Sequence, residues 1–197
     1  MRRRYENRGF VKSSLVDYPG KVCAVIFTQG CNFRCPYCHN PQLVYPELFT
    51  EPLDFEQVIA FLEKRKGLLE GVVFCGGEPT FQEDLPDAVR RVRSLGYAVK
   101  LDTNGSRPDI LAEILPCLDY IAMDIKAHFG AWYNTASGVT VDMYEIARSM
   151  LLIRASGLPY EFRTTLHPAF APPPVEKEIR KVLGKNEVYV VKNASVR

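Results

Sequence analysis

The stretch VCAVIFTQGCNFRCPYCHNPQ, residues 22–42, joins an apolar run of strand length to a loop that holds three cysteines. Cys31, Cys35 and Cys38 follow a CxxxCxxC spacing, and no fourth cysteine stands close enough in the sequence to complete a set of four. Three thiolates can hold three corners of a cubane iron–sulfur cluster and leave the fourth iron open to a substrate. An open coordination position is what a catalytic metal site requires. The loop therefore predicts chemistry at an open iron.

The bulk composition fits one globular domain of 197 residues, with 47% hydrophobic and 24% charged residues. We expect residues 1–20 to be an N-terminal extension, 21–166 the core, and 167–197 the last helix and strand. A net charge of +2 is too small to indicate a nucleic-acid surface. No apolar run approaches the length of a membrane span, and no signal peptide is visible. We therefore expect a cytoplasmic protein, whose reduced thiols serve as metal ligands or catalysts.

Apolar runs of strand length alternate with longer amphipathic stretches along the chain. The expected strands are Val22–Phe27, Gly71–Cys75, Tyr97–Asp102, Tyr120–Asp124, Tyr160–Leu166 and Glu187–Lys192. The expected helices are Asp54–Lys66, Leu85–Leu95, Asp109–Leu115, Asp142–Ala155 and Val175–Leu183. Such a series gives an open doubly wound sheet or a barrel, and six units are too few for a closed eight-unit barrel. We predict an α/β fold, a partial (β/α)6 barrel whose parallel sheet is open on one side.

Polar residues recur where the expected strands end. The second strand runs into Cys75-Gly76-Gly77-Glu78-Pro79, and the third into Asp102-Thr103-Asn104-Gly105. The fourth ends in Asp124-Ile125-Lys126, and the fifth carries Arg163. The carboxyl ends of parallel strands form the working rim of α/β folds. Together with the cysteine loop, these segments predict one site on that rim.

Each of these features also has a simpler interpretation. The cysteines could bind zinc with His39 as the fourth ligand, although adjacent Cys38 and His39 could hardly reach one ion without strain. The Gly-Gly-Glu-Pro segment could be only a tight turn, and the Asp-Thr-Asn-Gly segment a turn and helix cap. Asp124 and Lys126 point to the same side of a strand and could form a structural ion pair. The simpler interpretations weaken when the features are taken together.

Several motifs resemble those of one family of enzymes. GCNFRCPYCHN resembles the cluster loop of the radical S-adenosylmethionine (radical SAM) superfamily, and GGEP resembles its second motif. The segments SLVDYPG, CHNPQL, LDTNGS, MDIK and YEFRTT together resemble the activating enzymes of glycyl-radical enzymes. The similarity is greatest to the activating proteins of anaerobic ribonucleoside-triphosphate reductase, with the pyruvate formate-lyase activating enzymes as near relatives. It extends in order from about Gly9 to Leu166.

The resemblance implies a role for each matching residue. Cys31, Cys35 and Cys38 would ligate a [4Fe–4S] cluster, whose open iron would bind the amine and carboxylate of S-adenosylmethionine. Tyr37 would lie against the adenine, and the backbone of Gly76, Gly77 and Glu78 would bind the methionyl amine. Further contacts with the cofactor would come from Asn104, Lys126 and Arg163. A monovalent cation would be bound by Asp102 and Asp124. A cation beside a carboxylate makes a charge-assisted hydrogen bond. His39 would tune the cluster by contacting its ligands from outside rather than ligate it.

The resemblance also implies a reaction. Flavodoxin or ferredoxin would reduce the cluster, S-adenosylmethionine would be cleaved to methionine and a 5′-deoxyadenosyl radical, and the radical would take a hydrogen atom from a glycine of a partner enzyme. Two alternatives stay open. The chain could be a radical enzyme acting on a small molecule, similar to 7-carboxy-7-deazaguanine synthase, or a non-catalytic zinc or iron–sulfur module.

Overall fold

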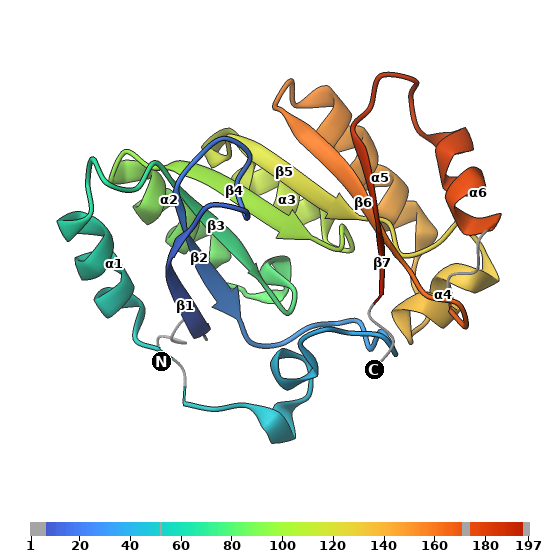
Figure 1. Cartoon of the computed structure of the whole chain (residues 1–197), viewed down its shortest axis with the longest axis horizontal. Helices are drawn as coiled ribbons and strands as arrows, with labels where there is room; N and C mark the ends of the chain where they lie inside the picture. The colour runs from blue at the N-terminus through green and yellow to red at the C-terminus, as the bar shows by residue number, and fades with distance from the viewer. Residues whose placement is uncertain (1–6, 52, 171–173, 195–197) are drawn as a thin grey trace.

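The computed structural model describes residues 7–51, 53–170 and 174–194, which form a seven-stranded sheet flanked by helices (Figure 1). The strands are β1 (Asn7–Ser14), β2 (Cys23–Thr28), β3 (Gly71–Gly76), β4 (Ala98–Thr103), β5 (Tyr120–Asp124), β6 (Tyr160–Leu166) and β7 (Tyr189–Asn193). The α-helices are α1 (Phe55–Lys64), α2 (Leu85–Ser94), α3 (Pro108–Ile114), α4 (Ala131–Ser137), α5 (Met143–Ala155) and α6 (Pro174–Val182). Strands β2 to β7 are parallel, and β1 pairs antiparallel with β2.

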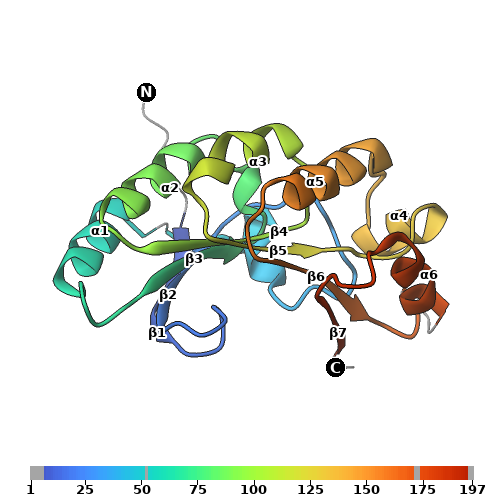
Figure 2. The ribbon, with the colours of Figure 1, turned by 90° about the horizontal axis from the view of Figure 1, so that it is seen from above.

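The order of the strands identifies the sheet as part of a barrel wall. A doubly wound sheet reverses its strand order at a switch point and carries helices on both faces. Here the spatial order follows the sequence from β1 to β7. Helices α1, α2, α3 and α5 lie along one face of the sheet (Figure 2). Because β1 and β7 are the two edges of the described sheet, the barrel is open on one side. The predicted partial barrel is confirmed.

The expected strands and helices all occur, each within two residues of the predicted ends. Two helices begin where an aspartate caps the first turn. The carboxylates of Asp54 and Asp142 accept hydrogen bonds from the backbone N–H groups of Glu56 and Tyr144. Within the described ranges, no helix combines the length and the apolar character needed to cross a bilayer.

Strand β1 was not predicted from the sequence. It lies in the segment that was expected to be an N-terminal extension. Its register places Gly9, Phe10 and Val11 opposite Phe27, Ile26 and Val25 of β2. One of its faces is partly buried: Phe10 packs edge-on against Phe61, with ring centroids 5.1 Å apart, whereas Val11 is exposed. An antiparallel edge strand with one buried face need not show a continuous apolar run. The periodicity was therefore too weak to reveal it.

Helix α4 is the second unpredicted element, and it packs against the cysteine loop. It has only seven residues, a length at which helical periodicity carries little information. Tyr133 in this helix is fully buried. The helix ends at Gly138, which has a left-handed φ of 70°. A Cβ atom there would lie 2.0 Å from the carbonyl oxygen of Arg34, so only glycine permits this contact.

Alternate side chains of the strands enter two layers of apolar packing. Ala24 and Ile26 belong to the large cluster on the helix-covered face. Cys23 and Val25 lie on the opposite face, hereafter the inner face, where Tyr18 from the β1–β2 loop packs against them. This loop explains why the strands are apolar on both faces although most of the helices lie on one. Cys23 is fully buried in this layer.

Candidate active site

The structure brings the predicted site residues together around one cavity of about 210 Å³. The twelve residues are Cys31, Cys35, Tyr37, Cys38, Gly76, Gly77, Glu78, Asp102, Asn104, Asp124, Lys126 and Arg163, and all of them line it. They come from the cysteine loop after β2 and from the carboxyl ends of β3 to β6. Seven residues outside the predicted set also line the cavity, namely Phe33, His39, Asn40, Val44, Cys75, Thr103 and Thr165.

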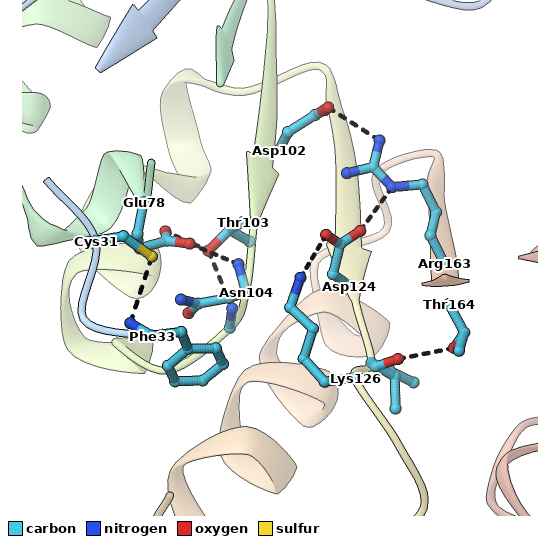
Figure 3. Close-up of polar contacts among 12 residues, drawn as sticks. Cys31, Phe33, Glu78, Asp102, Thr103, Asn104, Asp124, Lys126, Arg163 and Thr164 are labelled. Atoms are coloured by element: carbon cyan, nitrogen blue, oxygen red, sulfur yellow. Dashed lines mark hydrogen bonds and ion pairs between the residues drawn. The ribbon is translucent and has the colours of Figure 1, made fainter. Parts of the chain in front are cut away.

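Backbone contacts hold the cysteine loop in place. The N–H of Arg34 donates to the carbonyl of Ser137 at the end of α4 (2.7 Å). The Arg34 guanidinium donates to the carbonyl oxygens of Cys31 and Phe33, at 2.5 and 2.8 Å. The N–H of Phe33 points at the Sγ of Cys31, 3.4 Å away (Figure 3). The conformation of the loop thus depends on α4 as well as on its own sequence.

The three thiols are partly buried, and burial changes their acidity. Burial raises the pKa of Cys31 to about 12, and it also raises the pKa of Cys35. Since iron is bound by thiolates, loading a cluster here must release protons. Among the described residues, no group of three or more His, Cys, Asp or Glu side chains is placed to hold a single metal ion. In a [4Fe–4S] cluster each cysteine binds a different iron, so the thiols need not converge on one point.

The two glycines at the end of β3, Gly76 and Gly77, are required by close backbone packing. A Cβ on Gly77 would lie 2.0 Å from the carbonyl oxygen of Gly30, and a Cβ on Gly76 would lie 2.3 Å from the backbone nitrogen of Thr28. The N–H groups of Gly77 and Glu78 donate to the carbonyls of Thr28 (2.9 Å) and Gly30 (2.8 Å). The segment is therefore more than a tight turn, because it joins the end of β3 to the start of the cysteine loop.

Glu78 is buried, and its carboxylate is fully engaged within the protein. Oε1 accepts from the N–H (3.0 Å) and the hydroxyl (2.6 Å) of Thr80 and from the hydroxyl of Thr103 (2.7 Å). Oε2 accepts from the N–H of Asn104 (2.6 Å). Burial raises the pKa of Glu78, while these four donors oppose that rise. The side chain ties the end of β3 to the end of β4, a role that the sequence did not indicate.

Asn104 continues this tie to the cysteine loop. Its amide nitrogen donates to the Oδ1 of Asn32 (3.0 Å), and Asn32 in turn donates to the hydroxyl of Ser106 (2.8 Å). Its Oδ1 accepts from the N–H and the hydroxyl of Ser106, as expected for the local turn that was one interpretation of this segment. Asn104 therefore serves the turn and also positions the loop. Asn32 had no signal in the sequence beyond its place between two cysteines.

Charged side chains alternate along the inner face in a row that we call the charge ladder: Lys100, Asp102, Arg163, Asp124 and Lys126. Successive members are joined by contacts of 2.5, 2.9, 2.9 and 2.9 Å (Figure 3 shows the last four residues). Asp124 and Lys126 do form the ion pair that was the simpler interpretation of this segment. Burial alone would raise the pKa of Asp124, but Lys126 and Arg163 hold it well below its ordinary value.

Lys100 is the member of the ladder that the sequence did not predict. It stands two residues before Asp102 in β4, so the strand period places both side chains on one face. That signal was present in the sequence, but a lysine inside a strand carries no motif. The side chain is buried at 2% exposure and pairs with Asp102 below the cavity.

Tyr37 lies in an aromatic stack beside the cavity. Its ring is stacked with those of His167 and Phe170, with centroids 5.6 and 6.1 Å away. Its hydroxyl is buried without a hydrogen-bond partner among the described residues. Buried hydroxyls are rarely left unpaired. The orphaned hydroxyl therefore indicates that a ligand or solvent completes this part of the site.

The comparisons with known proteins identify the family. The sequence model of the Radical SAM superfamily matches residues 25–182. This chain therefore belongs to the radical SAM superfamily, whose enzymes use a [4Fe–4S] cluster and S-adenosylmethionine. The site fits both groups: three thiols share one cavity, and Tyr37, whose hydroxyl is unpaired, lines it too. Figure 3 shows the cationic side chains of Lys126 and Arg163 across from Cys31.

Two relatives show where the chain stands within the superfamily. A Methanocaldococcus jannaschii protein named "Putative glycyl-radical enzyme activating enzyme" is 32% identical over 193 residues, which cover 93% of this chain and 77% of the relative. The pyruvate formate-lyase-activating enzyme of Clostridium pasteurianum is 36% identical over 122 residues, covering 57% of this chain and 48% of the relative.

Solved structures share the fold. Streptococcus suis SuiB bound to S-adenosylmethionine matches with a TM-score of 0.68 at 17% identity, over 88% of this chain and 40% of that one. QueE from Escherichia coli matches with a TM-score of 0.53 at 14% identity, over 96% of this chain and 94% of that one. Identities this low establish the fold alone.

Proposed function

We propose that this chain is an activating enzyme for a glycyl-radical enzyme. The observation that carries the proposal is the convergence of all twelve predicted residues on one cavity. Similarity to a relative named as such an enzyme over 93% of the chain supports it. When bound, the cluster and S-adenosylmethionine supply one electron and a carbon-centred radical that removes a hydrogen atom from a glycine Cα of the partner.

The cysteine loop would hold the cluster. Cys31, Cys35 and Cys38 each offer one thiolate, and the described cavity residues include no other side chain placed with them around a single ion. His39 is exposed. An exposed histidine suits a zinc ligand less well than a group that contacts the cluster from outside. The geometry therefore supports the cluster over the zinc module.

The carboxyl ends of β3 to β6 would bind S-adenosylmethionine. A methionyl amine donates hydrogen bonds, so it would bind carbonyl oxygens of the Gly76–Glu78 segment. The N–H groups of Gly77 and Glu78 are not needed for it and already donate to Thr28 and Gly30. Lys126 and Arg163 line the cavity and would donate hydrogen bonds to the methionyl carboxylate. Tyr37 would lie against the adenine, as its place on the cavity wall allows.

The remaining parts of the proposal concern the partner and the setting. The motifs favour anaerobic ribonucleoside-triphosphate reductase as the protein substrate, and flavodoxin or ferredoxin as the electron donor. Free thiols that must ligate iron need a reducing compartment, so we place the reaction in the cytoplasm. The open side of the barrel offers a route by which a peptide loop of the partner could approach the cavity.

The test is a cysteine exchange with a matched control. Anaerobically reconstituted wild type should contain about four irons per chain and should form 5′-deoxyadenosine from S-adenosylmethionine and dithionite. Cys35→Ala should lose both, because one corner of the cluster loses its ligand. Cys117→Ala should keep both, since Cys117 does not line the cavity. Deoxyadenosine from Cys35→Ala at the wild-type rate would refute the cluster assignment. With the partner added, electron paramagnetic resonance should show a glycyl doublet.

A second candidate is a radical enzyme that acts on a small molecule. The 7-carboxy-7-deazaguanine synthase of Methanopyrus kandleri is 30% identical over 128 residues, covering 55% of this chain and 51% of that protein. Formation of 7-carboxy-7-deazaguanine without a protein partner would favour this candidate over the activating enzyme.

A further inference from the structure

The centre of the charge ladder is a guanidinium held between two carboxylates. Arg163 donates from Nε to Asp124 Oδ1 and from Nη1 to Asp102 Oδ2, both at 2.9 Å. The outer oxygens are also taken: Asp102 Oδ1 by Lys100 at 2.5 Å, and Asp124 Oδ2 by Lys126 at 2.9 Å. All four carboxylate oxygens thus have a cationic partner. This arrangement does not fit the expectation that the two aspartates bind a metal cation.

The register of the sheet puts Arg163 in this position. Arg163 of β6 is paired with Asp124 of β5, and Asp102 of β4 is paired with Ala122 of the same central strand. The two aspartates therefore stand on adjacent strands, and the arginine reaches both from the third. A planar fork with separate donors can span two carboxylates in this way, whereas the single point charge of a lysine cannot do so as well.

The charges of this region are balanced. The cations are Lys100, Lys126 and Arg163, and the anions are Asp102, Asp124 and Glu161, whose carboxylate lies 3.9 Å from Arg163. Removal of Arg163 alone would leave a deficit of one positive charge between two partly buried carboxylates. A monovalent cation has the charge to fill that deficit, whereas a divalent cation would exceed it.

We propose that Arg163 is the resident cation of this site, so that the wild-type protein needs no metal ion between Asp102 and Asp124. Neutralising Arg163 should then create a site for potassium or sodium. The inference rests on the proposed function only where it touches cofactor cleavage.

The experiment compares melting temperatures in potassium and in choline. Wild type, Arg163→Ala, Arg163→Gln, Arg163→Lys and Arg154→Ala are reconstituted anaerobically and melted in about 0.1 M potassium chloride or choline chloride, which have equal ionic strength. Arg154→Ala is the control, because it removes an arginine ion pair with Glu187, outside the cavity. Arg163→Gln is a second neutral variant, which replaces Arg163→Ala in the comparison if Arg163→Ala does not fold.

Only the neutral variants should respond to potassium. We expect their melting midpoints to rise by about 3–10 °C in potassium relative to choline, as for a ligand present well above its dissociation constant. Wild type, Arg163→Lys and Arg154→Ala should melt at the same temperature in both salts. Deoxyadenosine formation should follow the same pattern, with potassium restoring part of the activity of Arg163→Ala.

Two results would overturn the inference. If the wild type loses stability or deoxyadenosine yield in choline, a metal cation is needed beside the arginine. If neither neutral variant responds to potassium, the two aspartates do not form a cation site. Failure of every protein, wild type included, to cleave S-adenosylmethionine would count against the proposed function, while the melting comparison would still decide the role of Arg163.

Discussion

Glu78→Gln should destabilise the protein far more than a loss of one surface charge would. The carboxylate accepts hydrogen bonds from four donors and cannot reach solvent, because Glu78 is only 1% exposed. Three donors from Thr80 and Thr103 meet Oε1, and the N–H of Asn104 meets Oε2. Glutamine replaces one oxygen by an NH2 group, which can only donate. If the amide oxygen keeps the three-donor position, the NH2 group faces the N–H of Asn104.

The cost follows from that donor–donor contact. A buried donor left without an acceptor costs about 1–3 kcal/mol, and the loss of charge weakens the remaining hydrogen bonds by about 1 kcal/mol. Part of this is returned, because burial disfavours the charged carboxylate and raises the pKa of Glu78. The net effect should be about 2–3 kcal/mol, or a melting midpoint lower by about 4–12 °C for a chain of this size.

Urea unfolding of the metal-free protein under reducing conditions measures this directly. Far-ultraviolet circular dichroism should show a lower midpoint for Glu78→Gln at an unchanged slope. Glu113→Gln is the matched control: its exposed carboxylate pairs with Arg90 on the surface, so its effect should stay within about 0.5 kcal/mol. If the urea midpoints of Glu78→Gln and wild type coincide, the carboxylate does not hold the two strand ends together, and the reasoning fails.

Two further changes test the packing and the ionic contacts. Gly77→Ala should lower the iron content after reconstitution and reduce the free energy of unfolding by about 3 kcal/mol or more, because its Cβ would meet the Gly30 carbonyl. Gly67→Ala is the control: Gly67 has open space around it and a φ of 80°, so the substitution should reduce the free energy of unfolding by only about 1 kcal/mol. If the two variants load iron equally, the contact with Gly30 can be relieved by movement of the loop. The hydrogen bonds from Arg154 lower the pKa of Glu187 from 4.5 to about 2; the resulting stability is present above about pH 4.5 and disappears as the pH falls toward 2. Glu187→Gln should therefore flatten the dependence of the urea midpoint on pH in that window, by about 1 kcal/mol after solvent screening, and an unchanged slope against pH would contradict the assignment.

The parts of the site that could be predicted are those with local signals. The cysteine spacing lies within eight residues, and Asp102, Asp124 and Arg163 stand on strands whose apolar runs are visible. The elements that were missed had weak periodicity. β1 buries only one face, and α4 has seven residues, so neither length nor alternation distinguished them from loops.

The roles of several correctly placed residues could not be predicted, because they depend on partners far away in the chain. The backbone of Gly76 and Gly77 was expected at the methionyl amine, and the sequence did not indicate that a side chain on Gly77 would collide with the carbonyl of Gly30. Asp102 and Asp124 were expected at a metal cation, yet each is paired with Arg163. The sequence does not distinguish a carboxylate that is free to bind a ligand from one that is already paired with another side chain.

The amino-acid sequence alone determined the parallel strands β2 to β7 and the rim on which the chemistry lies, because these follow from short-range periodicity and from motif spacing. The tertiary structure decided how the site residues are connected. Arg163 reaches a carboxylate 39 residues away and another 61 residues away, and those contacts exist only because the register of three parallel strands brings their ends together. The physical reason is that backbone hydrogen bonds between neighbouring strands fix the strand register, and with it the positions of the side chains. The register depends on both strands of a pair, so no single segment of the sequence determines it.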